Sequence, residues 1–194
     1  MKKKLICVFA AALLLFTGCA SETEKNAVRD GFEKYFAFLK DADYGSANAI
    51  AFDADESDSI VSDITSGAVN DYIFKKVSYE IWGITKDGDT LNVDVVITQI
   101  SLASAYASSA AEFAEYISQA EKTGKEFSKS AMDKKFDELL YNSVQKEENF
   151  ASFRCTVPCI IQDGALRIGM TDRFRNALFG GELDAINSME KIGE

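Results

Sequence analysis

The sequence predicts an α+β domain in which N-terminal helices pack on a curved, antiparallel sheet of four strands. Three observations lead to this fold class. Apolar residues recur every three or four positions in residues 22–41, and they alternate with polar residues in two later stretches that each contain a turn. Between those two stretches, residues 102–146 contain one glycine and no proline, so we expect a helical insertion between two β-hairpins.

The first helix is predicted over residues 22–41, where apolar side chains occupy one face and charged residues the other. Ser21 followed by Glu24 has the spacing of a capping box at the start of this helix. Residues 41–52 predict a turn and a short second helix, and a third helix is expected at about 57–72. The apolar face of the first helix comprises Val28, Phe32, Tyr35, Phe36 and Leu39.

Two β-hairpins are predicted from the alternation of apolar and polar residues. The first turns at Asp87 and Gly88, a pair typical of tight hairpin turns, and the second turns within "QDGA" at 162–165. Pro158 is the only proline, and we expect it at a sheet edge or bulge because it cannot donate a ladder hydrogen bond. Two adjacent hairpins make a four-stranded sheet.

The insertion at 102–146 is predicted to form two helices that break near Gly124. A short closing helix is expected from Asp172 to the glycine pair at 180–181, with a tail helix after it. One apolar face of the insertion comprises Phe113, Tyr116, Ile117 and Ala120, and the other comprises Met132, Phe136, Leu139, Leu140 and Val144.

The first residues predict an export signal, because lysines at 2–4 precede an apolar run at 5–16. This run is shorter than the roughly 20 residues that a membrane-spanning helix needs. It ends in Phe16, Thr17, Gly18 and Cys19, which resemble the lipobox of bacterial lipoproteins, in which the cysteine becomes the lipidated first residue. The alternative is an ordinary signal peptide with an incidental cysteine.

The lipobox resemblance implies a division of the chain. Residues 1–18 would be the signal peptide, residues 19–26 the lipidated Cys19 with a polar tether, and residues 27–194 a single α+β domain. We therefore expect an exported protein that is held by acyl chains on the outer face of the bacterial cytoplasmic membrane.

The charge and residue composition argue against several classes of function. The formal net charge is −10, and it becomes about −13 when the three signal lysines are removed. Such an acidic surface repels phosphate backbones, so we expect no nucleic acid partner. The chain contains no histidine, which removes histidine-based nucleophile systems and histidine-ligated zinc.

No cofactor and no metal are expected either. Cys7 leaves with the signal peptide, and Cys155 and Cys159 would lie about 13 Å apart on a strand. That separation is too long for a disulfide unless the strand breaks at Pro158, so we expect two buried thiols. Residues 53–64 place acidic groups at positions of a calcium loop but lack its glycine and its final glutamate.

The predicted order of elements is similar to that of the cone-shaped α+β proteins of the nuclear transport factor 2 and ketosteroid isomerase group, also called cystatin-like. The phrase "FLKDADYGSANA" at Phe38–Ala49 resembles one in which the first helix ends in small bacterial lipoproteins of this layout. The insertion at 102–146 departs from the compact members. The resemblance implies a concave sheet face beneath the helices, and it implies no particular reaction.

Three functions remain open from the sequence. The first is a non-catalytic binding or interaction module for a small apolar ligand or a surface protein, with aromatic residues around a cavity. The second, implied by the resemblance, is a ketosteroid-isomerase-like enzyme with Asp94 as base and Tyr35 or Tyr79 as donor. The third is self-association or docking through the insertion. The candidate pocket residues are Tyr35, Tyr79, Trp82, Phe113 and Tyr116.

Overall fold

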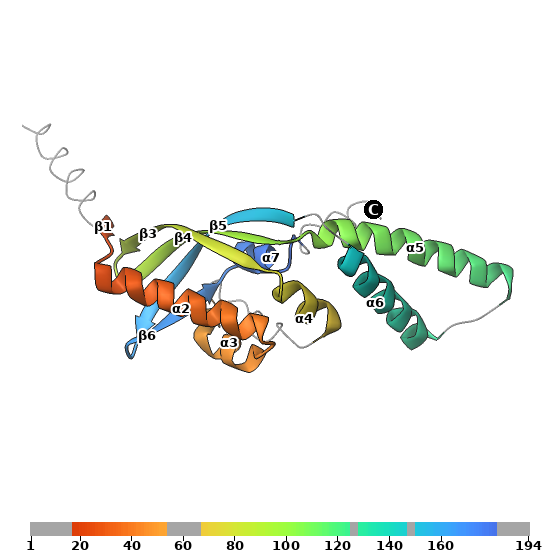
Figure 1. Ribbon diagram of the computed structural model, residues 1–194, viewed down its shortest axis with the longest axis horizontal. Coiled ribbons are helices and arrows are strands. Elements are labelled where there is room, and N and C mark those ends of the chain that lie inside the picture. The colour runs from red at the N-terminus through yellow and green to blue at the C-terminus, as the bar shows by residue number, and fades with distance from the viewer. Residues whose placement is uncertain (1–16, 54–66, 125–127, 147–149, 182–194) are drawn as a thin grey trace, which may run out of the picture.

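The computed structural model describes residues 17–53, 67–124, 128–146 and 150–181. Within these ranges the chain forms an α+β fold with six helices and one open, mostly antiparallel sheet of six strands (Figure 1). The elements are β1 (Thr17–Cys19), α2 (Glu22–Lys40), α3 (Tyr44–Ile50), β2 (Ala51–Asp53), α4 (Ala68–Phe74), β3 (Ser78–Asp87), β4 (Thr90–Ile100), α5 (Leu102–Lys122), α6 (Lys129–Lys146), β5 (Phe150–Gln162), β6 (Ala165–Met170) and α7 (Asp172–Leu178).

The sheet has the strand order β1-β3-β4-β5-β6-β2, and only the β2/β6 pair is parallel. Both predicted hairpins, β3/β4 and β5/β6, are confirmed, and β4 and β5 join them. The prediction of four strands was wrong, because β1 and β2 extend the two edges by three residues each. Segments this short show no alternation, so their strand character depends on pairing that the sequence pattern does not display.

Pro158 lies inside β5, opposite Asn92 of β4. On the other side of β5, the pairing with β6 begins only at Cys159 and runs to Gln162. The proline therefore sits where the strand has no β6 partner, which agrees with the expectation of a local edge.

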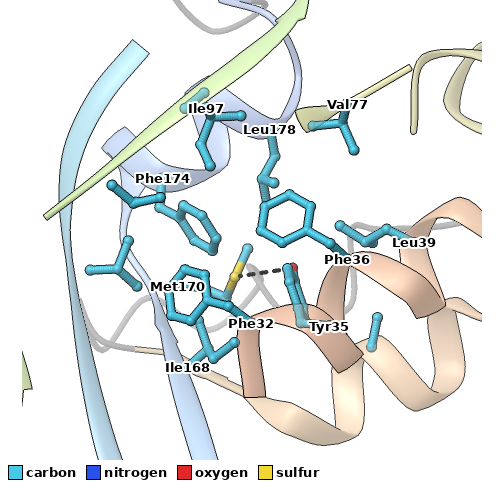
Figure 2. Close-up of a cluster of buried hydrophobic side chains, with 14 of the residues drawn as sticks. Phe32, Tyr35, Phe36, Leu39, Val77, Ile97, Ile168, Met170, Phe174 and Leu178 are labelled. Atoms are coloured by element: carbon cyan, nitrogen blue, oxygen red, sulfur yellow. Dashed lines mark hydrogen bonds between the residues drawn. The ribbon is translucent and has the colours of Figure 1, made fainter. Parts of the chain in front are cut away.

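The first helix and its capping box are confirmed as α2. All five of its predicted apolar side chains are buried, because they share the helix face that packs on the sheet. In Figure 2 the rings of Phe32, Tyr35 and Phe36 point from α2 toward β6 and α7, where they meet Met170 and Phe174. This aromatic cluster fills the space between α2 and the sheet.

The insertion forms two helices, α5 and α6, as predicted, and Gly124 follows α5 with a φ of +67°. The pair projects beyond the end of the sheet, opposite to β1 (Figure 1). We call α5 and α6 together the helical arm. Only the base of the arm belongs to the main core, where Leu140 and Val144 are buried and Tyr141 packs edge-on against Tyr72 of α4.

Several sequence predictions fall on residues outside the described ranges. These are the export signal before Thr17, the calcium-like segment after Asp53, most of the third helix predicted at 57–72, and the tail helix after the glycine pair. The short helix α4 covers part of the predicted third helix but continues to Phe74. The closing helix is confirmed as α7, with Thr171 as its cap.

Candidate functional site

The five aromatic residues predicted to line one pocket do not meet in one place. Tyr35 lies in the aromatic cluster and Tyr79 lies at its edge, stacked on Phe36 with ring centroids 4.3 Å apart. Trp82 lies on the opposite face of the sheet, because it alternates with Tyr79 and Ile81 along β3, and it is the extra residue of the bulge between Ile81 and Gly83. Phe113 and Tyr116 lie on the helical arm, with ring centroids 6.4 Å apart.

Tyr35 is a core residue in this structure. Its side chain is fully buried, and its hydroxyl donates toward Met170, with 3.6 Å between Oη and Sδ (Figure 2). Burial raises the pKa of Tyr35 above its ordinary value, because the charged phenolate would be desolvated. The residue therefore contributes packing area to the interior.

Asp94 lies on the open face of the sheet and pairs with Arg154 of the neighbouring strand. Arg154 donates from Nε to Asp94 Oδ1 at 3.0 Å and from Nη2 to Oδ2. Its guanidinium carbon also lies 4.8 Å from the ring centroid of Trp82, which is 57% exposed. The hydrogen bond from Arg154 holds the pKa of Asp94 below its ordinary value.

This arrangement does not assemble the acid-base set considered for an isomerase. Asp94 and the two tyrosines, Tyr35 and Tyr79, lie on opposite faces of the same sheet. A paired, ionised carboxylate with a lowered pKa is also a weaker base than a free one. Asp94, Arg154 and Trp82 instead form a cross-strand ladder over β3, β4 and β5.

A hollow of about 630 Å³ lies on the helical arm, next to one of the predicted site residues. Phe113 packs edge-on against Phe136 with ring centroids 5.5 Å apart, and the two rings form one wall. The hollow is open to solvent and its apolar floor has a charged rim. It is lined by Phe113, Lys129, Met132, Asp133, Phe136 and Asp137.

Pattern reasoning placed Phe113, Met132 and Phe136 on apolar helix faces but did not place them around a shared hollow. It missed Lys129, Asp133 and Asp137, the charged residues of the rim. The only sequence feature that pointed to the hollow was the pair of apolar faces on the two predicted helices. Two helices that project beyond the main core cover only part of each other's apolar surface. The rest of that apolar surface stays exposed to solvent.

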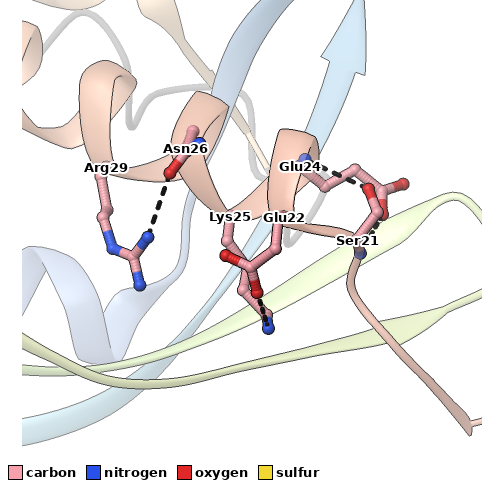
Figure 3. Close-up of polar contacts among 6 residues, drawn as sticks. All are labelled: Ser21, Glu22, Glu24, Lys25, Asn26 and Arg29. Atoms are coloured by element: carbon pink, nitrogen blue, oxygen red, sulfur yellow. Dashed lines mark hydrogen bonds and ion pairs between the residues drawn. The ribbon is translucent and has the colours of Figure 1, made fainter.

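Cys19 lies at the other end of the molecule and is exposed. The next residue, Ala20, is 3% exposed, and Ser21 caps α2 (Figure 3). Ser21 Oγ accepts from the Glu24 backbone N–H, and Glu24 Oε2 accepts from the Ser21 backbone N–H at 2.8 Å. Residues 22–26, which the lipobox resemblance assigns to the tether, form the first turns of α2, as the helix predicted at 22–41 requires.

The start of α2 is also joined to the sheet. Lys86 of β3 donates from Nζ to Glu24 Oε1 at 2.6 Å, across a half-buried contact. This ion pair and the two Ser21 bonds lower the pKa of Glu24 to about 2. Only Ala20 separates Cys19 from Ser21, so the cysteine can move little relative to the domain.

Cys155 and Cys159 are free and buried, as predicted. They lie on the core side of β5, where burial raises the pKa of Cys155 to about 11 and that of Cys159 to about 12. Neutral, buried thiols are poor nucleophiles and poor metal ligands. The described residues contain no group of three acidic or cysteine side chains that could hold a metal ion.

In the ranges that the structure describes, none of the helices has both the length and the apolar character that a membrane span requires. Comparisons with protein-family models, with curated proteins and with solved structures found no match to this chain. The likeness to the nuclear transport factor 2 group, and the lipobox, therefore stay predictions that rest on sequence pattern.

Proposed function

We propose that this protein is an exported lipoprotein, anchored through Cys19, that acts as a non-catalytic binding or interaction module with the helical arm as its contact element. The observation that carries the proposal is the position of the two sites. Exposed Cys19 and the helical arm lie at opposite ends of the long axis (Figure 1). An acyl group on Cys19 would thus place the arm at the end away from the membrane.

The anchor is supported by the lipobox-like residues and by the physics of acyl chains. Each buried methylene contributes about 0.8 kcal/mol, so a cysteine with two or more chains stays on a membrane. The acidic domain does not add attraction to anionic headgroups, because its mature net charge is about −13. The acyl chains alone would hold the protein.

The short connection after Cys19 supports an upright arrangement. Ala20 is buried and Ser21 is fixed by the capping box, so the membrane end of the domain cannot swing on a long tether. The arm adds reach, because α5 has 21 residues and is about 31 Å long at 1.5 Å per residue. A partner on the cell surface would meet the arm before it met the sheet.

For the fold, we propose the cone-shaped cystatin-like group as the parent architecture. The order of a long helix and two adjacent hairpins supports it, as does the packing of α2 and α7 against the strands. The aromatic cluster fills the space between α2 and the sheet, where the resemblance implies a concave face. This filling favours the interaction module over the isomerase.

Substitution of the cysteine tests the anchor. We expect Cys19→Ala to release the protein from the membrane fraction, and to remove the acyl mass from the N-terminal peptide in mass spectrometry. Cys7→Ala is the matched control, since it changes the other cysteine of the leader and should leave both readouts unchanged. Unaltered membrane retention of Cys19→Ala would contradict the proposal.

A further inference from the structure

We infer that the hollow side of the helical arm is a contact surface between two copies of this chain, which pair their arms into an antiparallel four-helix bundle. This inference rests on the proposed role of the arm as the contact element and names its partner. It follows from the packing of the arm, from its charge and from the position of the anchor.

The packing of the arm changes along its length. Near the base, Tyr106 and Phe136 pack against the main core. Farther out, Phe113, Tyr116 and Met132 are each only half-buried, and Met132 and Phe113 line the open hollow. Helix pairs bury such a stripe fully when a second pair completes a bundle.

Small residues close to Phe113 allow close approach of another helix. Ala110 and Ala114 lie four positions apart on α5, beside Phe113. A helix from a second copy would find small side chains here and large rings next to them. This alternation of small and large residues suits interdigitated helix packing.

The charge of the arm favours a second copy of this chain as the partner that covers the hollow. Residues 102–146 contain seven acidic and six basic side chains, whereas the whole chain has a net charge of −10. Two copies of an acidic protein repel each other least where they meet through this nearly neutral arm. Within the arm, α5 has a net charge of −2 and α6 of +1, so α5 of one copy complements α6 of the other.

The complementary pairing also sets the orientation. When α5 packs antiparallel to α6 of the other copy, both domains lie at the same end of the bundle. Glu121 at the tip of α5 then comes near Lys129 of the second copy, at the start of its α6. Both Cys19 residues would face one membrane, as two anchored copies require.

The available area fits a reversible dimer. An arm about 31 Å long and about 20 Å wide presents roughly 600 Å² per copy, or about 1,200 Å² in total. That total is at the lower end of the range for specific interfaces. We therefore expect a dimer that dissociates on dilution.

Sedimentation velocity on the soluble chain that begins at Ala20 tests the inference over a wide concentration range. We expect a monomer-dimer equilibrium that Met132→Glu weakens by about tenfold or more, because it places a charge in the apolar floor. Ala111→Glu is the control, since Ala111 is exposed on the arm away from the hollow. Circular dichroism checks that each variant keeps its helices.

A charge reversal provides a test that does not disturb the apolar packing. Lys129→Glu should weaken the dimer, and the further change Glu121→Lys should restore it in the double variant. A short bis-maleimide should link two Lys122→Cys chains tip to tip, whereas domains at opposite ends would put the tips about 31 Å apart.

A wild-type chain that stays monomeric at every concentration would overturn the inference and leave the hollow to a different protein or an apolar ligand. Equal weakening of the dimer by Met132→Glu and Ala111→Glu would also overturn the inference. So would a double variant that does not recover dimerisation, or Lys122→Cys chains that the bis-maleimide does not link. None of these outcomes affects the anchor, which Cys19→Ala measures separately in whole cells.

Discussion

Gly31 of α2 lies directly against Leu166 of β6. A Cβ atom at Gly31 would be 2.5 Å from Leu166 Cδ2 and 2.8 Å from Leu166 Cβ, both well inside van der Waals contact. The glycine therefore lets the helix approach the strand closely enough for the aromatic cluster to close around Met170. Backbone freedom is not the reason, because Gly31 is in the middle of a regular helix.

We predict that Gly31→Ala destabilises the protein by up to about 2 kcal/mol. Alanine favours the helix by about 1 kcal/mol, but overpacking against Leu166 costs about 1–3 kcal/mol. Urea unfolding of the soluble chain measures the difference. Gly45→Ala in α3 is the control, because its Cβ would meet only Asp43 Oδ1 at 3.8 Å, and we expect it to be neutral or stabilising.

The double variant Gly31→Ala, Leu166→Ala gives a stricter test. If steric contact is the cause, the two substitutions must couple, and Gly31→Ala should be less harmful in a chain that already carries Leu166→Ala than in the wild type. Strictly additive effects would contradict this explanation.

We predict that Glu24 contributes to acid sensitivity. Its pKa is lowered to about 2 by Lys86 and Ser21, so its stabilising effect is complete above the ordinary carboxyl value near 4.5. That effect is lost as the pH falls from about 4.5 toward 2. The melting temperature of Glu24→Gln should therefore lie below the wild-type value at pH 6 and approach it at pH 2.

Glu112→Gln is the control for this pH series, since Glu112 is an exposed acid of α5. Its melting curve should follow the wild type across the same range. A constant difference between Glu24→Gln and the wild type from pH 6 to pH 2 would show that the ion pair does not titrate as described.

We predict that Cys155 and Cys159 resist thiol reagents in the folded protein. With pKa values raised to about 11 and about 12, fewer than about one thiol in a thousand is ionised at pH 8. Ellman's reagent should label the soluble chain only after urea is added. Thr156→Cys, on the exposed side of the same strand, should react at once, and equally fast native labelling of the two natural thiols would contradict their burial.

We predict that Arg154 shields Trp82, the only tryptophan. Arg154→Ala should increase acrylamide quenching of the tryptophan fluorescence, with a stability loss below about 1 kcal/mol for an exposed pair. Asp94→Asn should give a smaller increase, because it loosens the guanidinium without removing it. Arg29→Ala on α2 is the control, and an increase of equal size there would mean that a general change in packing is responsible.

The long elements could be predicted because their apolar residues repeat with a helical or strand period. The core face of α2 and the two hairpins follow from single segments read alone. The edge strands could not be predicted in this way, because β1 and β2 are three residues long and exist through pairing with β3 and β6. Tertiary contacts decide such segments.

The candidate site was harder to predict than the fold. Aromatic residues mark a core as well as a pocket, and only the packing around Tyr35 distinguishes the two. Trp82, by contrast, faces outward through the ordinary alternation of β3, so the strand period alone separates it from Tyr79. For the helical arm the apolar faces were correctly predicted. The hollow lined by Phe113 and Met132 could not be predicted, because it depends on the packing geometry of α5 and α6.

The strand β1 has a consequence for maturation. Thr17 and Gly18 pair with Asp87 and Lys86, and only the last pair, Cys19 with Thr85, would survive cleavage before the cysteine. The proposed cleavage would therefore leave part of the β3 edge bare, and bare strand edges invite strand addition from other molecules. In the proposed lipoprotein, an acyl group on Cys19 would hold this bare edge of β3 next to the membrane surface.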